Sequence, residues 1–393
     1  MDKKELGIYI HIPYCKQKCY YCDFISYTNP SLLEQYVKVI IQELEKYDLN
    51  NYNVTTIYIG GGTPSYIKSE YIVKILNFIK QKLLKSNNQT KFEDIEITIE
   101  VNPGTVDRKK LEDYINCGIN RLSIGLQTTN NILLKQIGRI HTYEEFLETY
   151  KLATDIGFKN INIDLMLGLP NQTINDLKNS LNDIIKLNPN HISVYSLIIE
   201  EGTKINDMLT KGELKLPNEE IERQMYWYVK DKLELNGYNH YEISNFAKKG
   251  KESKHNVNCW KQKEYIGIGV AGHSYLDGIR YANCLKVEDY IENMNNLKDA
   301  LKEIKNAESN IYEIEEIQSL DDKKKEFMLL GLRMIDGICI SEFKERYVDN
   351  PIFLYRKELE KLVDENLIVI DGDNIRLTNK GLDLANLVWE EFV

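Results

Sequence analysis

The sequence has little of what several classes of protein require. No apolar run approaches the roughly 18 residues of a membrane-spanning helix, so we expect no membrane span. No N-terminal signal or transit pattern is seen, because a strand-like segment begins almost at once. Basic residues are outnumbered, with 50 Lys and Arg against 60 Asp and Glu and a formal charge of −10. That balance argues against nucleic acid as a partner, since such binding needs cations to neutralise phosphates.

Cysteine is also scarce. The 393 residues include seven cysteines, an odd number, and three of them stand together, so the sequence predicts no disulfide framework. A reducing cytoplasm is the location that we expect. The remaining composition, 42% hydrophobic and 28% charged, is ordinary for a soluble globular protein. The length suits one large α/β domain with a small appended domain.

The most informative stretch is residues 7–24, GIYIHIPYCKQKCYYCDF, a buried strand that leads into a loop. The loop carries Cys15, Cys19 and Cys22 in the order C-x3-C-x2-C. Thiolates suit zinc or iron–sulfur clusters, but a structural zinc site normally has four protein ligands, and the loop holds no fourth Cys or His. The alternative is three cysteines packed as small hydrophobic residues, which the flanking lysines disfavour. We therefore predict a [4Fe–4S] cluster with one iron left open.

Strand-like and helical segments alternate through the first half of the chain, which predicts parallel βα units in an α/β fold. Strands are expected at 7–12, 54–59, 95–101, 121–127, 160–167 and 191–197, and helices at 31–47, 69–84, 108–115, 143–156 and 174–187. Polar and glycine-rich residues follow the strands, where α/β barrels place their active sites. The pattern by itself fits an open doubly wound sheet as well as a barrel.

The second half of the chain is less regular. A helix is expected at 214–235, followed by a stretch rich in glycine and aromatic residues at 238–283. The last part reads as two helices and a hairpin at 368–377, turned at Asp371-Gly372-Asp373, which resembles a small winged-helix module. We predict three parts: a first domain at 1–285, a polar helical linker at 286–322 and a C-terminal domain at 323–393.

Candidate binding residues stand where the expected strands end. The segment 60–64, GGGTP, follows a strand directly, and glycines there let a ligand approach the backbone, although a tight turn is the plainer alternative. Glu100 ends the third strand, where a carboxylate either accepts hydrogen bonds from ribose hydroxyls or is simply solvated. Gln127 ends the fourth, and Arg139 can pair with a ligand carboxylate unless it is a surface arginine. Asp164 lies in an apolar segment and therefore needs a polar partner.

Four histidines fall into two groups by their sequence context. His11, His141 and His191 are expected to be core histidines with satisfied hydrogen bonds. His255 stands in the segment HNVNCW, and a histidine beside cysteine and aromatic residues can bind an iron porphyrin, because His and Cys are the usual axial ligands. A packed aromatic loop is the alternative for that segment.

The cysteine spacing, together with YIGGGTPS and EVNPGT, resembles the radical S-adenosylmethionine (SAM) superfamily. In that superfamily, SAM chelates the open iron of the cluster through its amino and carboxylate groups, inside a partial (βα)6 barrel. The resemblance implies this fold for the chain and a [4Fe–4S] cluster on the three cysteines. The residues that match SAM-lining positions of the superfamily are Tyr9, Tyr21, Gly61, Gly62, Thr63, Glu100, Gln127, Arg139, Asp164 and Ile198.

Further motifs along nearly the whole chain, among them RLSIGLQT, NIDLMLGLP, YEISNFA and HNxxxW before GHSY, resemble one group within the superfamily. It includes the oxygen-independent coproporphyrinogen III oxidase and the related HemW haem chaperones. The oxidase carries a further cysteine two residues after the third, where this chain has Phe24, and a long extension before the cluster motif, where this chain has about a dozen residues. Both differences favour the chaperones. Their motif is usually HNxxYW, so Cys259 in the tyrosine position is either a second iron ligand or a neutral change, and His255 is the leading haem ligand.

The resemblance implies a cytoplasmic protein that binds haem, a [4Fe–4S] cluster and SAM, and delivers haem to acceptor proteins. Peripheral contact with membrane haem proteins is compatible with that role. A second hypothesis is an enzyme that makes a 5′-deoxyadenosyl radical and oxidatively decarboxylates the propionates of coproporphyrinogen III. A third is a radical enzyme acting on an unrelated substrate, because a SAM site does not name its substrate. The oligomeric state, the mode of haem attachment and productive cleavage of SAM stay open.

Overall fold

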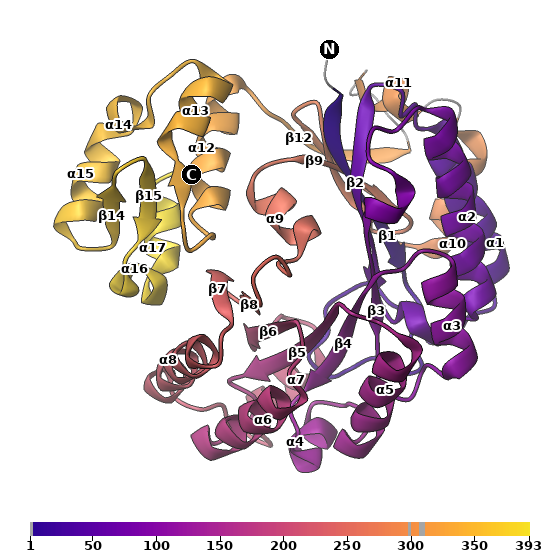
Figure 1. Cartoon of the computed structure of the whole chain (residues 1–393), viewed down its shortest axis with the longest axis horizontal. Helices are drawn as coiled ribbons and strands as arrows, with labels where there is room; N and C mark the ends of the chain where they lie inside the picture. The colour runs from indigo at the N-terminus through magenta and orange to yellow at the C-terminus, as the bar shows by residue number, and fades with distance from the viewer. Residues whose placement is uncertain (1–2, 298–299, 306–310) are drawn as a thin grey trace.

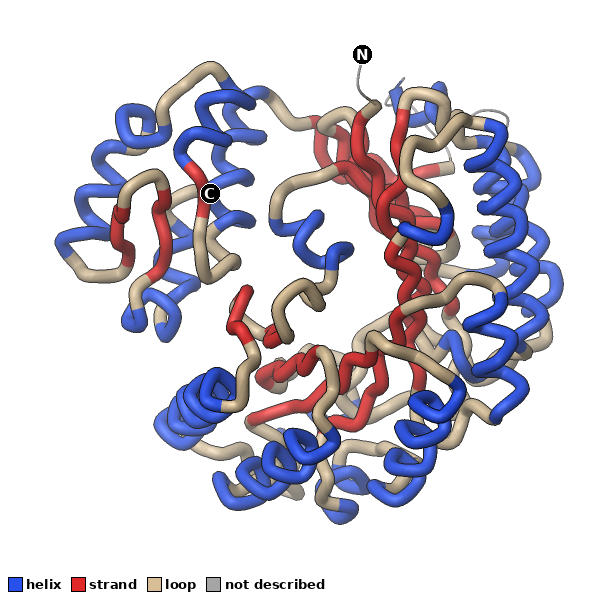
Figure 2. Tube along the Cα trace, viewed as in Figure 1, coloured by secondary structure: helices blue, strands red, loops and turns tan. Residues whose placement is uncertain are grey.

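One curved sheet with helices on its outer side forms the body of the computed structural model, which describes residues 3–297, 300–305 and 311–393 (Figure 1, Figure 2). Six parallel strands pair in chain order: β1 (Lys4–Ile12), β2 (Tyr52–Gly61), β3 (Glu96–Val101), β4 (Arg121–Gln127), β5 (Ile161–Leu167) and β6 (His191–Ser196). A doubly wound sheet would reverse its strand order, and this one does not. Because no pairing joins β1 to β6 among the described strands, the barrel is partial and open.

The connecting helices cover the convex face of this sheet (Figure 1). They are α1 (Leu33–Lys46), α2 (Ser69–Lys85), α3 (Arg108–Asn116), α4 (Asn131–Gln136), α5 (Tyr143–Ile156) and α6 (Ile174–Leu187), with short 3-10 turns at Pro64–Tyr66 and Phe92–Asp94. Successive strand residues point to opposite faces. In β5, for example, Ile161, Ile163 and Leu165 are buried in the main core, whereas Asp164 and Met166 line the interior cavity.

The predicted strands and helices of this half agree with the structure to within a few residues. The helix expected at 214–235 starts later, as α8 (Glu219–Leu235). Pro217 has no N–H to donate, and the Asn218 side chain caps the helix by accepting from the Ile221 N–H at 2.8 Å. A short helix that the sequence analysis did not anticipate, α7 (Lys204–Thr210), precedes it. None of the described helices is both long and apolar enough to cross a bilayer.

Six further strands widen the sheet at its two edges. Beyond β6 lies β8 (Asn245–Ala247), which is antiparallel to β6, and then β7 (Asn239–Glu242), which is antiparallel to β8. Beyond β1 lie β9 (Glu264–Ile268), which is parallel to β1, and then β10 (His273–Leu276), β11 (Ile279–Asn283) and β12 (Tyr312–Ile317). The short helix α9 (Lys254–Trp260) connects β8 to β9 and therefore spans the open side of the barrel (Figure 1).

The predicted helical linker at 286–322 differs from the structure. Helices α10 (Val287–Asn296) and α11 (Ala300–Lys305) are present, but β12 follows them and pairs with β11, so this segment belongs in part to the large sheet. Tyr312 and Ile314 are at least half-buried and the glutamates beside them are exposed, and charged residues of this kind are typical of an edge strand. Residues 298–299 and 306–310 of the predicted linker lie outside the described residues. The division into three domains stays a prediction.

The C-terminal part has a core of its own. It contains α12 (Leu320–Gly331), α13 (Ile340–Tyr347), α14 (Pro351–Leu354), α15 (Arg356–Asp364), α16 (Asn379–Asp383) and α17 (Ala385–Glu390), with a small sheet of β13 (Ile338–Cys339), β15 (Asn374–Leu377) and β14 (Ile368–Asp371). The predicted hairpin is present as β14 and β15, and Gly372 in its turn has a φ of +61°. Helices and a three-stranded sheet fit the predicted winged-helix-like module.

Two backbone hydrogen bonds join this C-terminal part to the edge of the large sheet. The Ile243 N–H donates to the Arg333 carbonyl at 3.1 Å, and the Ile335 N–H donates to the Tyr241 carbonyl at 3.1 Å. Glu242 and Met334 form an antiparallel bridge between them. The segment from 333 to 335 thus acts as one more strand beside β7.

Candidate cofactor site

A cavity of about 510 Å³ opens at the carboxyl ends of the parallel strands. The three cysteines of the motif line it, together with residues of β2 to β6. The loop after β1 and the ends of the following strands therefore form one site. Nine of the ten residues predicted to line a SAM site also line this cavity: Tyr21, Gly61, Gly62, Thr63, Glu100, Gln127, Arg139, Asp164 and Ile198. The tenth, Tyr9, lies outside the lining and stacks on Tyr58. Parallel strands bring their carboxyl ends to one side of a barrel, which is why residues so far apart in the sequence meet here.

The cysteine loop is held in place by backbone hydrogen bonds. The Cys15 N–H donates to the Tyr27 carbonyl at 3.0 Å, and the Tyr20 N–H donates to the Ile137 carbonyl at 3.0 Å. Cys15 is buried, whereas Cys19 and Cys22 are half-buried. Burial raises the pKa of the Cys15 thiol, and it raises that of Cys22 to about 11. Thiolates here therefore need cations beside them, which iron would supply.

A polar shell surrounds two of these sulfur atoms. The Thr63 hydroxyl donates to the Cys15 Sγ at 3.4 Å, and Arg139 Nη1 donates to the Cys19 Sγ at 3.5 Å. Donors of this kind stabilise sulfur that carries negative charge. Among the described residues, no three His, Cys, Asp or Glu side chains are arranged to hold a single metal ion. A cubane does not require that arrangement, because each thiolate binds a different iron.

The glycine segment after β2 packs directly against the cysteine loop. The Gly62 N–H donates to the Ile12 carbonyl at 2.9 Å, and a Cβ on Gly62 would lie 3.0 Å from the Cys15 Sγ. Gly61 has a φ of +111°, and a Cβ there would lie 2.7 Å from the His11 ring. Both positions therefore need glycine, for space at Gly62 and for space and backbone conformation at Gly61.

Glu100 presents its carboxylate to the cavity from the end of β3. The Tyr58 hydroxyl donates to Oε1 at 3.0 Å, and the Gly61 N–H donates to Oε2 at 3.2 Å. Burial, and to a smaller extent the nearby Asp164, raises the pKa of Glu100 to about 7. A carboxylate accepts up to about four hydrogen bonds, so this one has capacity left for ligand hydroxyls.

Asp164 has the polar partners that its apolar sequence context requires. Asn162 Nδ2 donates to Oδ1 at 2.8 Å, and the Ser123 hydroxyl donates to Oδ2 at 3.0 Å. Burial is the main influence on the pKa of Asp164 and raises it, although these hydrogen bonds act in the other direction. The expectation that this carboxylate is paired is confirmed.

Arg139 is not a surface arginine. Its Nη2 donates to the Asn102 Oδ1 at 2.7 Å and to the Gly125 carbonyl, while its buried Nε has no hydrogen-bond partner among the described residues. The side chain of Arg139 faces the cavity.

Gln127 also faces the cavity, and its backbone has a φ of +74° at a register shift between β4 and β5. Such backbone strain in a residue other than glycine is found mainly at functional sites.

Several cavity residues were not anticipated from the sequence. Asn102 links the Thr63 hydroxyl, to which it donates at 2.8 Å, with Arg139. The EVNPGT segment contains Asn102, so the family motif itself held a signal for it. Tyr58 and Ser123 lie on the inward faces of β2 and β4. Because strand residues alternate between the two faces, the periodicity of each strand could have predicted both positions. Phe24, in the position of the oxidase cysteine, is 62% exposed at the cavity.

His255 lies outside the cavity, on α9, with only 8% of its surface exposed. Its Nδ1 lies 2.9 Å from the Thr56 Oγ1, and its ring stacks on Tyr58 with 5.2 Å between ring centres. Burial, with a smaller effect from Arg121, lowers the pKa of His255 to about 4. The imidazole is therefore neutral near pH 7. If Nδ1–H donates to Thr56, Nε2 keeps a lone pair for a metal.

Cys259 lies one helical turn after His255 on α9 and is half-buried. Burial raises the pKa of its thiol to about 12, although Arg280 acts in the other direction. Burial raises the pKa of the cluster-loop thiol of Cys22 as well, so this shift does not separate a second iron ligand from a neutral change, and both alternatives stay open for Cys259.

The remaining histidines behave largely as expected. His11 contacts the Tyr9 hydroxyl and the Ile25 carbonyl, and His191 contacts Asn162 and Tyr241. Both are satisfied core histidines, as predicted. His141 is buried as well, but its Nε2 has no hydrogen-bond partner among the described residues.

Two segments of the chain match known family models. Residues 9–184 match the model of the radical SAM superfamily, and residues 318–384 match the HemN C-terminal domain. The haem chaperone HemW of Lactococcus lactis is 35% identical over 100% of this chain and 98% of its own length. The HemW of Bacillus subtilis is 36% identical over 98% of both chains. The chain belongs to the HemW family.

Membership of HemW, within the radical SAM superfamily, implies a [4Fe–4S] cluster and SAM as cofactors. The groups that line the cavity are of the types that both cofactors need. Three thiols can bind the cluster, and the carboxylate, amide and guanidinium groups beside them can bind the polar groups of SAM. The solved structure of the coproporphyrinogen III oxidase HemN from Escherichia coli superposes with a TM-score of 0.81 over 100% of this chain and 91% of that chain. At 22% identity, this likeness shows the shared fold.

Proposed function

We propose that the protein is a haem chaperone that binds a [4Fe–4S] cluster, SAM and haem and passes haem to acceptor proteins in the cytoplasm. The observation that carries the proposal is the similarity to HemW haem chaperones along the entire chain, in both the barrel and the C-terminal part. Phe24 supports it further, because the additional cysteine of the oxidase is absent from the cluster loop.

In this proposal Cys15, Cys19 and Cys22 each bind one iron of the cluster. SAM would chelate the fourth iron through its amino and carboxylate groups. Thr63 and Arg139 donate to the sulfur atoms of Cys15 and Cys19 and orient those ligands. The remaining cavity residues bind the rest of SAM: Tyr21, Gly61, Gly62, Glu100, Gln127, Asp164 and Ile198. Tyr9 supports the pocket from behind Tyr58.

Haem binds at His255 in this proposal. Thr56 accepts the Nδ1 proton, which fixes the tautomer in which Nε2 coordinates iron. The low exposure of the imidazole has a consequence: a porphyrin reaches Nε2 only after α9 moves away from the barrel. In this proposal the structure is a closed state of the haem site.

Haem titration tests the proposal. The protein with its reconstituted cluster is mixed anaerobically with haem, the Soret band is followed, and haem retained after desalting is measured. We expect stoichiometric retention by the wild type and loss of at least tenfold in affinity in His255→Ala. His273→Ala is the control, since His273 is an exposed histidine that pairs with Glu315 at the sheet edge.

A parallel assay separates the chaperone from the oxidase. Coproporphyrinogen III, SAM and a reductant are incubated with the protein, and protoporphyrinogen IX is measured. We expect none. Formation of that product without stable haem retention would overturn the chaperone proposal.

A further inference from the structure

Tyr58 connects the two sites of the proposed function. Its hydroxyl donates to the Glu100 Oε1 at 3.0 Å, at the wall of the cofactor cavity. The face of its ring lies against the imidazole of His255, with 5.2 Å between ring centres and 30° between planes. One rigid side chain therefore contacts the carboxylate proposed to bind the ribose of SAM and the imidazole proposed to bind haem.

The position of the Tyr58 ring is closely constrained. It stacks on Tyr9, with 6.2 Å between ring centres, as well as on His255. A Cβ on Gly60 would lie 3.0 Å from the Tyr58 Cε1 and 3.0 Å from the Glu100 Oε1, so the ring and the carboxylate fill the space above that glycine. A ring held this way cannot follow His255 when the imidazole moves.

The stack belongs to the closed state of the haem site. The same imidazole that lies on Tyr58 is held by Thr56 through Nδ1 and is 8% exposed. Iron binds Nε2 at the edge of the imidazole, in the plane of the ring, and the buried position of His255 leaves no room there for a porphyrin. Haem binding therefore requires α9 to move away from the barrel, and this movement separates the imidazole from Tyr58. Any ligand that strengthens the hold on Tyr58 therefore favours the closed state.

We propose that Tyr58 is a positioning residue that couples the two ligands, so that SAM binding weakens haem binding. Glu100 already accepts from Tyr58 and Gly61 and has room for two more donors, which the ribose hydroxyls supply without displacing Tyr58. A carboxylate fixed by SAM in turn fixes the Tyr58 hydroxyl and keeps the ring under His255. This inference rests on the proposed function, because it takes Glu100 as the ribose acceptor and His255 as the haem ligand.

Thermodynamic linkage makes the coupling measurable from both sides. If SAM lowers the affinity for haem by some factor, haem lowers the affinity for SAM by the same factor. Couplings of this kind are typically about 5-fold or more. In cells, SAM would then promote the release of haem to an acceptor.

The test uses the full-length protein with its reconstituted cluster under anaerobic conditions without reductant, so that SAM stays intact. Haem is titrated alone, with saturating SAM, and with methionine, which carries the amino and carboxylate groups but no ribose. We expect SAM to raise the apparent Kd for haem about 5-fold or more and methionine to leave it unchanged. SAM is then titrated with and without haem to check reciprocity.

Two variants locate the coupling. Tyr58→Phe keeps the ring and removes the hydroxyl, and we expect it to retain both ligands while the effect of SAM on haem disappears. Tyr58→Leu removes the ring as well, and we expect tighter haem binding without SAM. The matched control is Tyr238→Phe, which removes a buried hydroxyl that donates to the Pro189 carbonyl at 2.9 Å and does not line the cofactor cavity. This control should keep the antagonism.

The possible outcomes distinguish failure of the proposed function from failure of the coupling. A wild type that retains no haem overturns the proposed function and the coupling with it. A wild type that binds haem equally well with and without SAM, or more tightly with SAM, overturns the coupling and leaves the chaperone role standing. Antagonism that persists in a folded Tyr58→Phe variant removes Tyr58 from the connection.

Discussion

Arg333 lies over the indole ring of Trp260, with 4.3 Å between its Cζ and the ring centre. The same guanidinium is 5.0 Å from the ring centre of Trp389. Trp260 ends α9, the helix that carries His255, whereas Arg333 and Trp389 belong to the C-terminal part. The C-terminal part therefore holds the helix that closes the proposed haem site.

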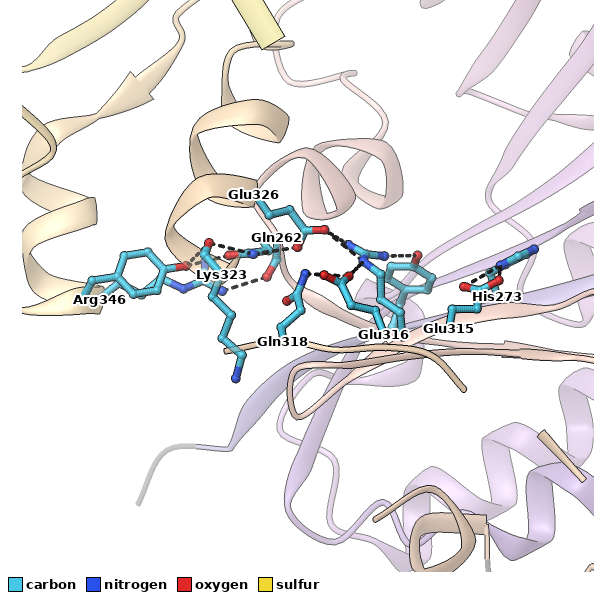
Figure 3. A network of polar contacts seen from close by, with 11 residues as sticks. Gln262, His273, Glu315, Glu316, Gln318, Lys323, Glu326 and Arg346 are labelled. Carbon is cyan, nitrogen blue, oxygen red and sulfur yellow. Dashed lines mark hydrogen bonds and ion pairs between the residues drawn. The ribbon is translucent and has the colours of Figure 1, made fainter. Parts of the chain in front are cut away.

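A second set of contacts holds the same end of α9 (Figure 3). Gln262 Nε2 donates to the Glu326 Oε2 at 2.7 Å and to the Lys323 carbonyl at 3.1 Å. Arg346 Nη2 donates to the Gln262 carbonyl at 2.9 Å. Glu326 also pairs with Arg280 of β11, so the network ties the helix to both the C-terminal part and the sheet edge. Opening of α9 must break contacts of both kinds.

Loosening this hold should speed haem binding. In Arg333→Met the contacts with both indole rings are lost, and each cation–π contact of a partly desolvated arginine contributes about 1–2 kcal/mol. We expect haem to associate about tenfold faster, because about 1.4 kcal/mol less is needed to open α9. Stopped-flow mixing with haem measures the rate. Arg356→Met, which removes a more distant contact with Phe353 at 5.8 Å, is the control and should leave the rate unchanged.

The cluster ligands are tested by cysteine substitution. We expect Cys15→Ala, Cys19→Ala and Cys22→Ala each to lose most of the roughly four irons and the matching sulfide that reconstitution gives, because a cubane needs all three thiolates. Iron and sulfide analysis measures the loss. Cys117→Ala serves as the control: its thiol contacts the Tyr114 carbonyl at 3.2 Å, away from the cavity, and the variant should bind a full cluster. A full cluster in any motif variant would exclude that cysteine as a ligand.

A buried carboxylate gives a prediction about pH. Glu43 accepts from the Gly269 N–H, the Asn283 amide and the Tyr290 hydroxyl, and burial raises its pKa from 4.5 to about 7. Since the folded state prefers the protonated form, the contribution of Glu43 to stability is present below pH 4.5 and lost as the pH rises through about 7. Over that window the loss is on the order of 3 kcal/mol.

Urea unfolding at several pH values measures this contribution. As the pH rises from about 4.5 to 7, the wild type loses the stability that Glu43 contributes, and Glu43→Gln should lack this loss because Gln does not titrate. This expectation holds whatever the absolute stability of the variant. Glu93→Gln removes a carboxylate that is 73% exposed and should keep the wild-type pH dependence. Parallel curves for wild type and Glu43→Gln would show that Glu43 does not titrate in this range.

Glycine substitutions separate backbone strain from crowding. Gly61 and Gly202 both have positive φ, but a Cβ on Gly61 meets the His11 ring at 2.7 Å, whereas one on Gly202 meets nothing within 4 Å. We expect Gly202→Ala to cost about 1 kcal/mol of stability, from strain alone. Gly61→Ala should cost more and should also weaken SAM binding, because the Gly61 N–H would move away from Glu100. Isothermal titration with SAM decides the point: equal affinity in Gly61→Ala and Gly202→Ala would contradict it.

Those parts of the site that depend on a local sequence pattern could be predicted from the sequence. Three cysteines at fixed spacing, and strand ends followed by Gly61, Glu100 and Gln127, can be read along the chain because period and position determine where these residues point. The six parallel strands followed from the same alternation. The choice of a partial barrel over a doubly wound sheet required the family resemblance, since strand order is a property of three dimensions.

What the sequence did not show depends on packing between distant segments. His255 stacks on Tyr58, a residue 197 positions earlier in the chain. Nothing in the local sequence HNVNCW shows whether its imidazole is buried or exposed. The strand β12 inside the predicted linker is stabilised by pairing with β11, a partner that its own sequence does not specify. The strained conformation of Gln127 likewise comes from the register shift with β5.

The pairing of residues 333–335 with β7 also protects the chain from self-association. Without it, the outer side of β7 would present unpaired N–H and C=O groups, a template on which another chain can add a strand. A polypeptide that ended before α12 would therefore expose this edge while the rest of its barrel stayed intact. We expect such a fragment to aggregate through its sheet edge, which would give the C-terminal part a second role beside its contacts with α9.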